Sequence, residues 1–194
     1  MLRTKRIEPQ TFPLAALAEW FREFYSGSPW GECQRCPRCS PQGDFGGAGR
    51  YADPDLERCL VCGAELEAYW SDLRAEEYFL DAANRPGFAG NVHHVGNELA
   101  GWTWGYLAST VGELAEHPAS CVYIDVIGVL PAFRQYVLEV FDAGHNLARE
   151  CGYESTVTRT RSDAKYVQEA MAAYGYTFLK PSSDGEREYW AYRL

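Results

Sequence analysis

The sequence predicts an α/β (α+β) domain with a mixed, mostly antiparallel sheet, helices on both faces of that sheet, and a small metal-bound insert near the N-terminus. Three observations predict this architecture. Residues 91–129 form short apolar and alternating runs separated by turn residues, as antiparallel strands do. Residues 134–180 then read helix, strand, helix, strand, which adds parallel pairing to the sheet. Paired Cys-x-x-Cys motifs lie at either end of a long segment that has neither helical nor strand periodicity.

The composition and the distribution of apolar residues predict the domain count and argue against a membrane-spanning or a secreted protein. Of the 194 residues, 46% are hydrophobic, so we expect one domain over 1–194 with residues 26–63 as an inserted zinc-binding module. No apolar run reaches the roughly 18 residues of a membrane span, and no secretory signal begins the chain. We therefore expect a cytoplasmic protein without a membrane partner. The formal net charge of −9 makes nucleic acid an unlikely partner for the surface as a whole.

The first part of the chain alternates between periodic and irregular segments. Residues 4–9 fit a short strand, and apolar residues at three- and four-residue spacing predict a helix over 12–25 that Thr11 caps. The stretch 26–58, rich in Gly, Pro, Ser and Asp, has no period and needs something to order it. Residues 64–82 return to helical spacing.

The second part is predicted to hold three antiparallel strands, a long helix, a strand, a helix and two closing strands. The ranges are, in order, 91–96, 98–109, 120–129, 134–151, 154–160, 164–174, 176–180 and 187–194. Gly152 and Gly175 are the expected helix stops, and Ser162 or Asp163 the expected cap of the last helix. We expect 98–109 and 120–129 to be antiparallel neighbours and 154–160 to run parallel to 120–129.

Five of the seven cysteines lie between Cys33 and Cys62, in the motifs CQRCPRC and CLVCG. Two-residue gaps let both sulfurs of one turn reach the same ion, and tetrahedral zinc takes four thiolates. We therefore expect a structural zinc, and the predicted ligands are Cys36, Cys39, Cys59 and Cys62.

The cysteine motifs leave other interpretations open. Cys33 has the same spacing to Cys36, so it is either a spare cysteine or a replacement for Cys39. Unmetallated thiols in a loop are the alternative to a metal site. The module could also present arginines to a partner, namely Arg35, Arg38 and Arg58.

Four segments between residues 98 and 180 resemble, in order, the GNAT superfamily of acyl-CoA-dependent N-acyltransferases. The first two resemble its central strands and the start of its CoA-binding helix, and the last two its fifth strand and fourth helix. These segments read ELAGWTWGYLAS, YIDVIGVLPAFR, GYESTVTRT and AKYVQEAMAAYGYTFL. The first carries an aromatic-rich Gly-x-x-x-Gly, and the second the loose motif Val-x-Pro-x-x-Arg.

The resemblance implies a site for acetyl-CoA or another acyl-CoA. In this family the fourth strand splays from the fifth, and the pantetheine arm pairs with the exposed backbone. Carried onto this chain, that backbone is Ile127, Gly128 and Val129, and the pyrophosphate lies at the helix start, near Arg134 and Gln135. Asp125 falls where related members carry an acidic residue beside the acceptor amine; pointing to solvent or pairing with an arginine is the alternative.

The chain departs from the family pattern at two places. The two small residues of the phosphate turn are replaced by Val137 and Glu139, which add bulk and negative charge where a dianion binds. The tyrosine that often protonates the departing thiolate would fall at Met171, with Tyr174 nearby.

We therefore expect acetyl transfer to an amine by direct attack within a ternary complex. The acceptor would be a small molecule or a protein. The alternative is a catalytically inactive protein that uses the fold and the zinc module to bind a protein or nucleic-acid partner.

Overall fold

The computed structural model describes residues 1–27, 30–39 and 55–194. The predicted irregular stretch 26–58 therefore lies partly outside the described residues. The chain divides into two compact units, the first made of Met1–Phe12 with Leu80–Leu194 and the second of Pro13–Phe79.

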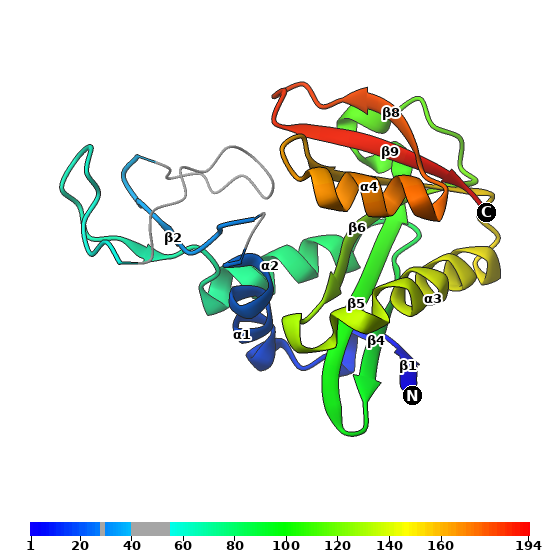
Figure 1. The fold of residues 1–194 in the computed structure, drawn as a ribbon, viewed down its shortest axis with the longest axis horizontal. Helices are drawn as coiled ribbons and strands as arrows, with labels where there is room; N and C mark the ends of the chain where they lie inside the picture. Colours follow the sequence, from blue (N-terminus) through cyan, green and yellow to red (C-terminus); the bar gives the residue numbers. More distant parts are fainter. Residues whose placement is uncertain (28–29, 40–54) are drawn as a thin grey trace. The chain divides into compact units, whose positions relative to one another are not determined.

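The first unit contains a seven-stranded mixed sheet in the order β1-β4-β5-β6-β7-β9-β8 (Figure 1). Its strands are β1 (Leu2–Arg6), β4 (Ala89–Val95), β5 (Glu98–Leu107), β6 (Cys121–Val129), β7 (Ser155–Arg161), β8 (Thr177–Pro181) and β9 (Arg187–Arg193). β6 and β7 pair in parallel and the other neighbours are antiparallel. The predicted fold class and both predicted strand pairings are thus confirmed.

Helices α3 (Val137–Glu150) and α4 (Lys165–Tyr174) belong to the same unit, and α3 contacts β4, β5 and β6. Four short 3-10 helices accompany them, namely η1 (Pro9–Thr11), η2 (Ala108–Thr110), η3 (Gly112–Leu114) and η4 (Pro131–Tyr136). Gly152 and Gly175 have φ of 84° and 110° and end the two helices, as predicted.

The predicted cap of α4 was wrong. Ala164 is the N-cap residue and no side chain caps the helix. The Asp163 carboxylate instead accepts two hydrogen bonds from the Arg161 guanidinium, at 2.8 and 2.7 Å. A charged partner two residues away has taken the carboxylate that the cap would have used.

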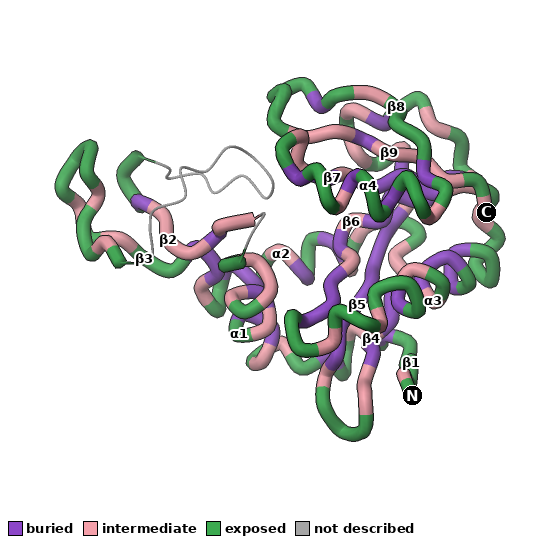
Figure 2. Tube along the Cα trace, in the orientation of Figure 1, coloured by how far each residue is buried: buried purple, intermediate pink, exposed green. Residues whose placement is uncertain are grey.

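The central strands carry the core of this unit. β5 is buried at nearly every position, on both of its faces, as Figure 2 shows. Trp102 and Trp104 are fully buried, and Phe12 meets the Trp104 ring edge-on at a centroid distance of 6.4 Å. Large buried aromatic side chains hold β5 and its neighbours in place, and the site described below depends on that rigidity.

The second unit contains α1 (Leu14–Tyr25), the short strands β2 (Gln34–Arg35) and β3 (Glu67–Ala68), and most of α2 (Asp72–Ala83). Its core is aromatic: the Phe21 ring lies 4.6 Å from Trp70 and 5.8 Å from Tyr78. Arg22 donates to the Trp70 carbonyl at 2.8 Å and ties α1 to the segment before α2.

Two predictions at the ends of these helices were wrong. Thr11 does not cap α1, because it lies in the 3-10 helix η1 (Pro9–Thr11) and its hydroxyl is 3.4 Å from the Glu8 carbonyl. The helix predicted over 64–82 begins only at Asp72. Glu67 and Ala68 pair with Arg35 and Gln34 instead, so long-range strand pairing overrides the local helical spacing.

In the described part of the chain, none of the helices combines the length and the apolar run that crossing a bilayer requires.

Candidate functional site

The strands β6 and β7 separate half-way along their length. Their parallel ladder runs from Cys121 opposite Ser155 to Ile124 opposite Thr158 and stops there. β6 continues beside β5 to Val129, and β7 continues beside β9 to Arg161. Each strand therefore keeps one neighbour and presents an open backbone edge toward the other.

Two local features produce this separation. Val126 and Ile124 pair with consecutive residues of β5, so Asp125 is the extra residue of a β-bulge, which bends the strand. The Thr158 hydroxyl donates to the Ile124 carbonyl at 3.0 Å, at the last paired position. A side chain thus satisfies the backbone acceptor where the ladder ends.

The Gly-x-x-x-Gly of the sequence, Gly101 and Gly105, lies on β5 on either side of the bulge. A Cβ at Gly101 would stand 2.2 Å from the Gly128 carbonyl oxygen, and one at Gly105 would stand 2.4 Å from that of Tyr123. Both distances are far below any contact between real atoms, so only glycine allows β5 to approach the bulged strand this closely.

The carboxylate of Asp125 is half-buried and lies among aromatic and cationic groups. Burial raises the pKa of Tyr106 and of Tyr123, and the charge of Asp125 raises both further. The Arg85 guanidinium lies 4.6 Å above the Tyr106 ring and pairs with Asp81 at 2.8 Å. Burial opposes the charge of Arg85, but the bond to Asp81 and the nearby Asp125 raise its pKa.

The residues carried over as backbone partners, Ile127, Gly128 and Val129, lie on the open section of β6 beyond the bulge. Gly128 also has little room, because a Cβ there would stand 3.0 Å from the Trp102 indole. This part of the strand has no ladder partner on the side of β7, and an extended ligand can pair with such an edge.

The start of α3 differs from an open anion site. Residues 131–136 coil into η4, and the Phe133 and Val137 N–H groups donate to the carbonyls of Leu130 and Arg134. Backbone donors bonded within the turn are not directed at an external phosphate.

The side chains at this turn point into solvent. Arg134, Gln135, Val137 and Glu139 are all exposed. Glu139 lies in the first turn of α3, where a carboxylate stabilises the helix dipole. The arrangement suits the helix itself and opposes an incoming dianion.

The tyrosine that would protonate the departing thiolate is also replaced in this chain. Met171 is buried and has no proton to give. Tyr174 donates to Asp142 and lies 3.2 Å from His145 Nδ1. Its hydroxyl is therefore bonded within the fold, and burial together with Asp142 raises its pKa.

His145, which was not among the residues predicted from the sequence, lies at the centre of this network. Its Nε2 lies 2.7 Å from the Tyr176 hydroxyl, and its ring stacks on Tyr192 at 4.4 Å. Burial lowers the pKa of His145 to about 4, so the imidazole is neutral. The available signal was its place in the apolar stripe of its helix, four residues after Phe141.

The second unit brings the four predicted zinc ligands together. The sulfur atoms of Cys36, Cys39, Cys59 and Cys62 lie within 4.8 Å of one another. The Cys36 and Cys62 sulfurs are 3.4 Å apart, and those of Cys39 and Cys59 are 3.9 Å apart. Tetrahedral zinc at its usual Zn–S length requires sulfurs about 3.8 Å apart, so this cluster fits the ion.

The electrostatics of the cluster also fit a cation. Hydrogen bonding to Cys62 and Cys36 raises the pKa of the Cys39 thiol to about 12. The N–H groups of Cys62 and Val61 lower the pKa of Cys59 to about 6. Thiols this close cannot all ionise together without a cation to compensate their charge.

Cys33 does not belong to this cluster. Its thiol lies 3.4 Å from the Ser26 carbonyl, and its own carbonyl accepts the Tyr69 N–H at 3.0 Å. Next to it, Arg35 pairs with Glu67 at 2.5 Å across the β2–β3 ladder. Cys33 therefore lies outside the cluster, next to the β2–β3 pair. Its carbonyl connects the residue before β2 to the residue after β3.

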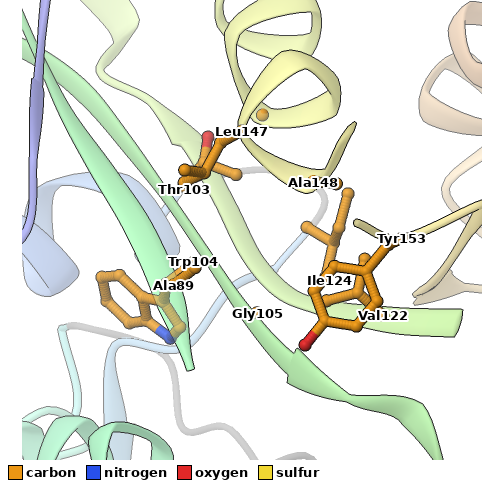
Figure 3. Close-up of a pocket in the computed structure, with 10 residues that line it drawn as sticks. Ala89, Thr103, Trp104, Gly105, Val122, Ile124, Leu147, Ala148 and Tyr153 are labelled. Carbon is orange, nitrogen blue, oxygen red and sulfur yellow. The ribbon is translucent and has the colours of Figure 1, made fainter. Parts of the chain in front are cut away.

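A small pocket lies between the sheet and α3 (Figure 3). Gly105 and Gly144 are among the residues that line it, and its lining is almost wholly apolar. The Tyr153 hydroxyl at its edge donates to the Gly87 carbonyl at 3.2 Å. None of the lining residues is acidic or basic, so this pocket has no acid or base to offer.

No family model matches the sequence, and no curated protein matches it. Solved structures do share its fold. The PaiA N-acetyltransferase of Thermoplasma acidophilum in complex with coenzyme A is 7% identical, with a TM-score of 0.62 over 100% of this chain and 99% of its own. An aminoglycoside 6'-acetyltransferase type Ii is 10% identical, with a TM-score of 0.58 over 98% and 96%. An acetyltransferase of Thermus thermophilus is 13% identical, with a TM-score of 0.55 over 100% and 97%. The chain therefore has the fold of the GNAT acetyltransferases, as the resemblance predicted.

Proposed function

We propose that this chain transfers an acyl group from acyl-CoA to an amine at the opening between β6 and β7. The observation that carries the proposal is the separation of the two strands at Asp125, the bulge residue. Beyond the bulge, the edge of β6 that faces β7 has no neighbouring strand in the ladder, and an extended ligand can pair with such an edge.

The site residues on β6 each have a defined part in this reaction. The backbone of Ile127, Gly128 and Val129 pairs with the extended arm of the acyl donor as an added strand would. The Asp125 carboxylate accepts a proton from the acceptor's ammonium group. The freed amine nitrogen attacks the thioester carbonyl carbon and the new C–N bond forms. The nitrogen then releases its remaining extra proton to solvent, the C–S bond breaks, and the thiolate leaves with the electron pair of that bond.

The proton for the departing thiolate comes from solvent in this proposal. Met171 cannot donate one, and the Tyr174 hydroxyl is bonded to Asp142. Binding of the pyrophosphate is weak, because η4 uses its own donors and Glu139 repels the dianion. Arg134 and Gln135 are the exposed groups at this turn that remain to contact it.

The start of α3, where η4 uses its own backbone donors and Glu139 repels a dianion, also favours a second candidate, a binding protein without turnover. A chain that no longer holds CoA would keep the fold and the cysteine module for a protein or nucleic-acid partner. The two candidates differ in one property, which is whether acyl-CoA binds at all.

For the cysteine cluster we propose one structural zinc held by Cys36, Cys39, Cys59 and Cys62. Four thiolates leave no open coordination position, so the ion orders residues 26–63 and takes no part in acyl transfer. We keep this segment as a separate module inserted into a single acetyltransferase-like domain.

Transfer of acetyl groups to a panel of amines, followed by mass spectrometry, tests the proposal. Asp125→Asn should lower kcat by 10²- to 10⁴-fold, the usual contribution of a positioned base, and leave acetyl-CoA binding intact. Glu98→Gln is a matched control, because Glu98 is an exposed carboxylate on the neighbouring strand β5. Equal activity of all three proteins would exclude Asp125 from the reaction.

A further inference from the structure

The strand β1 lies at one end of the seven-stranded sheet, and β4 is its one neighbour among the described residues. Every residue of β1 pairs with β4 in regular register, without a bulge. Figure 2 shows that β1 is exposed over most of its length. The edge of β1 that faces away from β4 is therefore an uninterrupted row of backbone groups to which a further strand can add.

The ladder shows which backbone groups point to this open edge. The Ile7 N–H donates to the Gly90 carbonyl at 2.8 Å, so these two residues form a hydrogen-bonded pair of the antiparallel ladder. Such pairs alternate with pairs that exchange no bond, and Thr4 and Arg6 fall at the second kind. The Thr4 hydroxyl lies 3.0 Å from His93 Nδ1, in accord with the closer side chains of such a pair. The N–H and C=O groups of Thr4 and Arg6 therefore point away from β4.

The strand β8, at the other end of the sheet, is protected in a way that β1 is not. Its register is interrupted between Phe178 and Lys180, and Pro181 is its last residue. The Lys180 ammonium donates to the Glu113 carbonyl and pairs with Glu116 at 3.2 Å. A bulge and a proline both hinder the addition of another strand. β1 has neither of them, so its side chains alone decide which strand can approach.

Three of the five residues of β1 are cations, namely Arg3, Lys5 and Arg6, and all three are exposed. None of them has an acidic partner in the described part of the chain, where the ion pairs use other cations. The Arg3 guanidinium lies 3.4 Å from the Asn97 amide oxygen, and that of Arg6 lies 3.3 Å from the Cys151 sulfur. β4, with the sequence AGNVHHV, contributes no carboxylate. This edge is therefore cationic in a chain whose formal net charge is −9.

Two of these cations lie on one face of the sheet. Side chains alternate along a strand, so Arg3 and Lys5 project from the same face, and His94 lies opposite Arg3 in the ladder. Burial lowers the pKa of His94, and the charges of Arg3 and Lys5 lower it further. The β1 of a second copy would bring cations against cations, which like-charge repulsion disfavours. A strand with a carboxylate at every second position would instead place opposite charges side by side.

We infer that the open edge of β1 binds an extended acidic segment of a partner protein, which pairs with the backbone of Thr4 and Arg6 as an added strand and places carboxylates beside Arg3 and Lys5. This inference is independent of the proposed acyl transfer. In strand addition, main-chain hydrogen bonds hold the segment and its alternate side chains select it. A phosphodiester backbone fits less well, because its phosphates accept hydrogen bonds and leave the outward carbonyls without donors.

Fluorescence anisotropy with labelled peptides and the whole protein tests this inference. The probe is the acidic peptide Thr-Glu-Val-Glu-Val-Glu-Thr. One matched peptide has Lys in place of Glu, and another has Pro in place of Val, which keeps the charge but prevents strand pairing. We expect the first peptide alone to bind, with an affinity that falls as salt is added, because the charges are exposed. Hydrogen exchange at the Thr4 and Arg6 amides should slow in the complex.

Two pairs of variants separate charge from backbone pairing. Lys5→Glu should weaken binding of the acidic peptide by about tenfold or more, whereas Arg193→Glu, the same charge change at an exposed position of β9, should not. Arg6→Gln and Arg6→Pro both remove a charge, and the proline also removes an N–H that the ladder with β4 does not use. The proline variant should therefore bind the peptide several-fold more weakly than the glutamine variant.

Three kinds of result would overturn the inference. Equal binding of the valine and proline peptides, or equal binding by Arg6→Gln and Arg6→Pro, would rule out strand addition. Absence of binding to the acidic peptide, or binding that Lys5→Glu leaves unchanged while the variant keeps its thermal midpoint, would rule out β1 as the surface. Tighter binding of a single-stranded oligonucleotide of the same charge would assign this edge to nucleic acid instead.

Discussion

The cysteine cluster and the opening between β6 and β7 are stabilised by different forces. The cysteine turns bury little: Leu60 and Val61, between two of the ligands, are 85% and 68% exposed. The strands at the opening are held by fully buried neighbours such as Trp102, Trp104 and Val126. We therefore propose that the cysteine cluster needs an ion to keep its shape, whereas the opening between β6 and β7 depends on packing and on two glycines.

Removing the metal should give the largest effect and should be confined to one side of this comparison. Structural zinc supplies about 10–16 kcal/mol of binding free energy, which is folding energy for its own loop. Cys59→Ser or a strong chelator should abolish the zinc signal in elemental analysis and bring the amides of 30–39 and 55–68 to rapid hydrogen exchange. Exchange in β5 and β6 should be unchanged.

The control is Cys33→Ser, which changes a cysteine outside the cluster and leaves the four proposed ligands in place. It should retain one zinc per chain. Protein purified without added metal that contains no zinc, and whose thiols all react freely, would contradict the metal site.

Acid should weaken the unit that contains the sheet. Burial lowers the pKa values of His93 and His145 to about 4, from an ordinary value near 6.5. The unfolded chain therefore binds more protons than the native one between these values. Stability is fully present above about pH 6.5 and falls as the pH drops toward 4, by up to roughly 3 kcal/mol for each histidine.

Denaturant unfolding measured at several pH values between 4 and 7 checks this expectation. His145→Gln should remove part of the slope, because the variant has no imidazole to protonate at that site. A free energy of unfolding that stays constant over this range would show that neither histidine is held neutral by the fold.

Substituting Gly105 should give a smaller effect at the opening itself. A Cβ there would stand 2.4 Å from the Tyr123 carbonyl oxygen, so Gly105→Ala forces β5 away from β6. We expect a loss of about 1–3 kcal/mol in the free energy of unfolding, typical of overpacking. Gly112→Ala is the matched control, since nothing lies within 4 Å of its Cβ, and it should be neutral or slightly stabilising. Equal effects of the two substitutions would argue against a tight approach at Gly105.

The two sites also differ in how far the sequence could predict them. Cys36 and Cys39 are separated by two residues, as are Cys59 and Cys62, so local spacing was enough to predict that these four sulfurs cluster, although it left the place of Cys33 open. The separation at Asp125 arises from strand register, which depends on residues such as Gly105 and Thr158 that are distant in the chain. The resemblance placed Asp125 near an acceptor, but no local pattern predicted that this residue would form a β-bulge.

The helices and strands also divide into those that the local sequence pattern predicted and those that a distant or charged partner decided. Alternation and helical spacing located the strands of the sheet and the helices α1, α3 and α4. The helix predicted from residue 64 was wrong because pairing of Glu67 with Arg35 decides the structure there. The expected caps at Thr11 and Asp163 failed because nearby groups already bond them. Local propensity is a weak guide wherever a distant or charged partner competes.

Calorimetric titration of the natural protein with acetyl-CoA tests the central claim most directly. We predict weak but measurable binding, and tightening of about ten- to hundredfold when Val137→Gly and Glu139→Gly are combined, because bulk and charge at the phosphate turn are then removed. No heat of binding in either protein would contradict acyl transfer and favour the binding-protein candidate. Tight binding by the natural protein would show that groups other than this turn hold the phosphates.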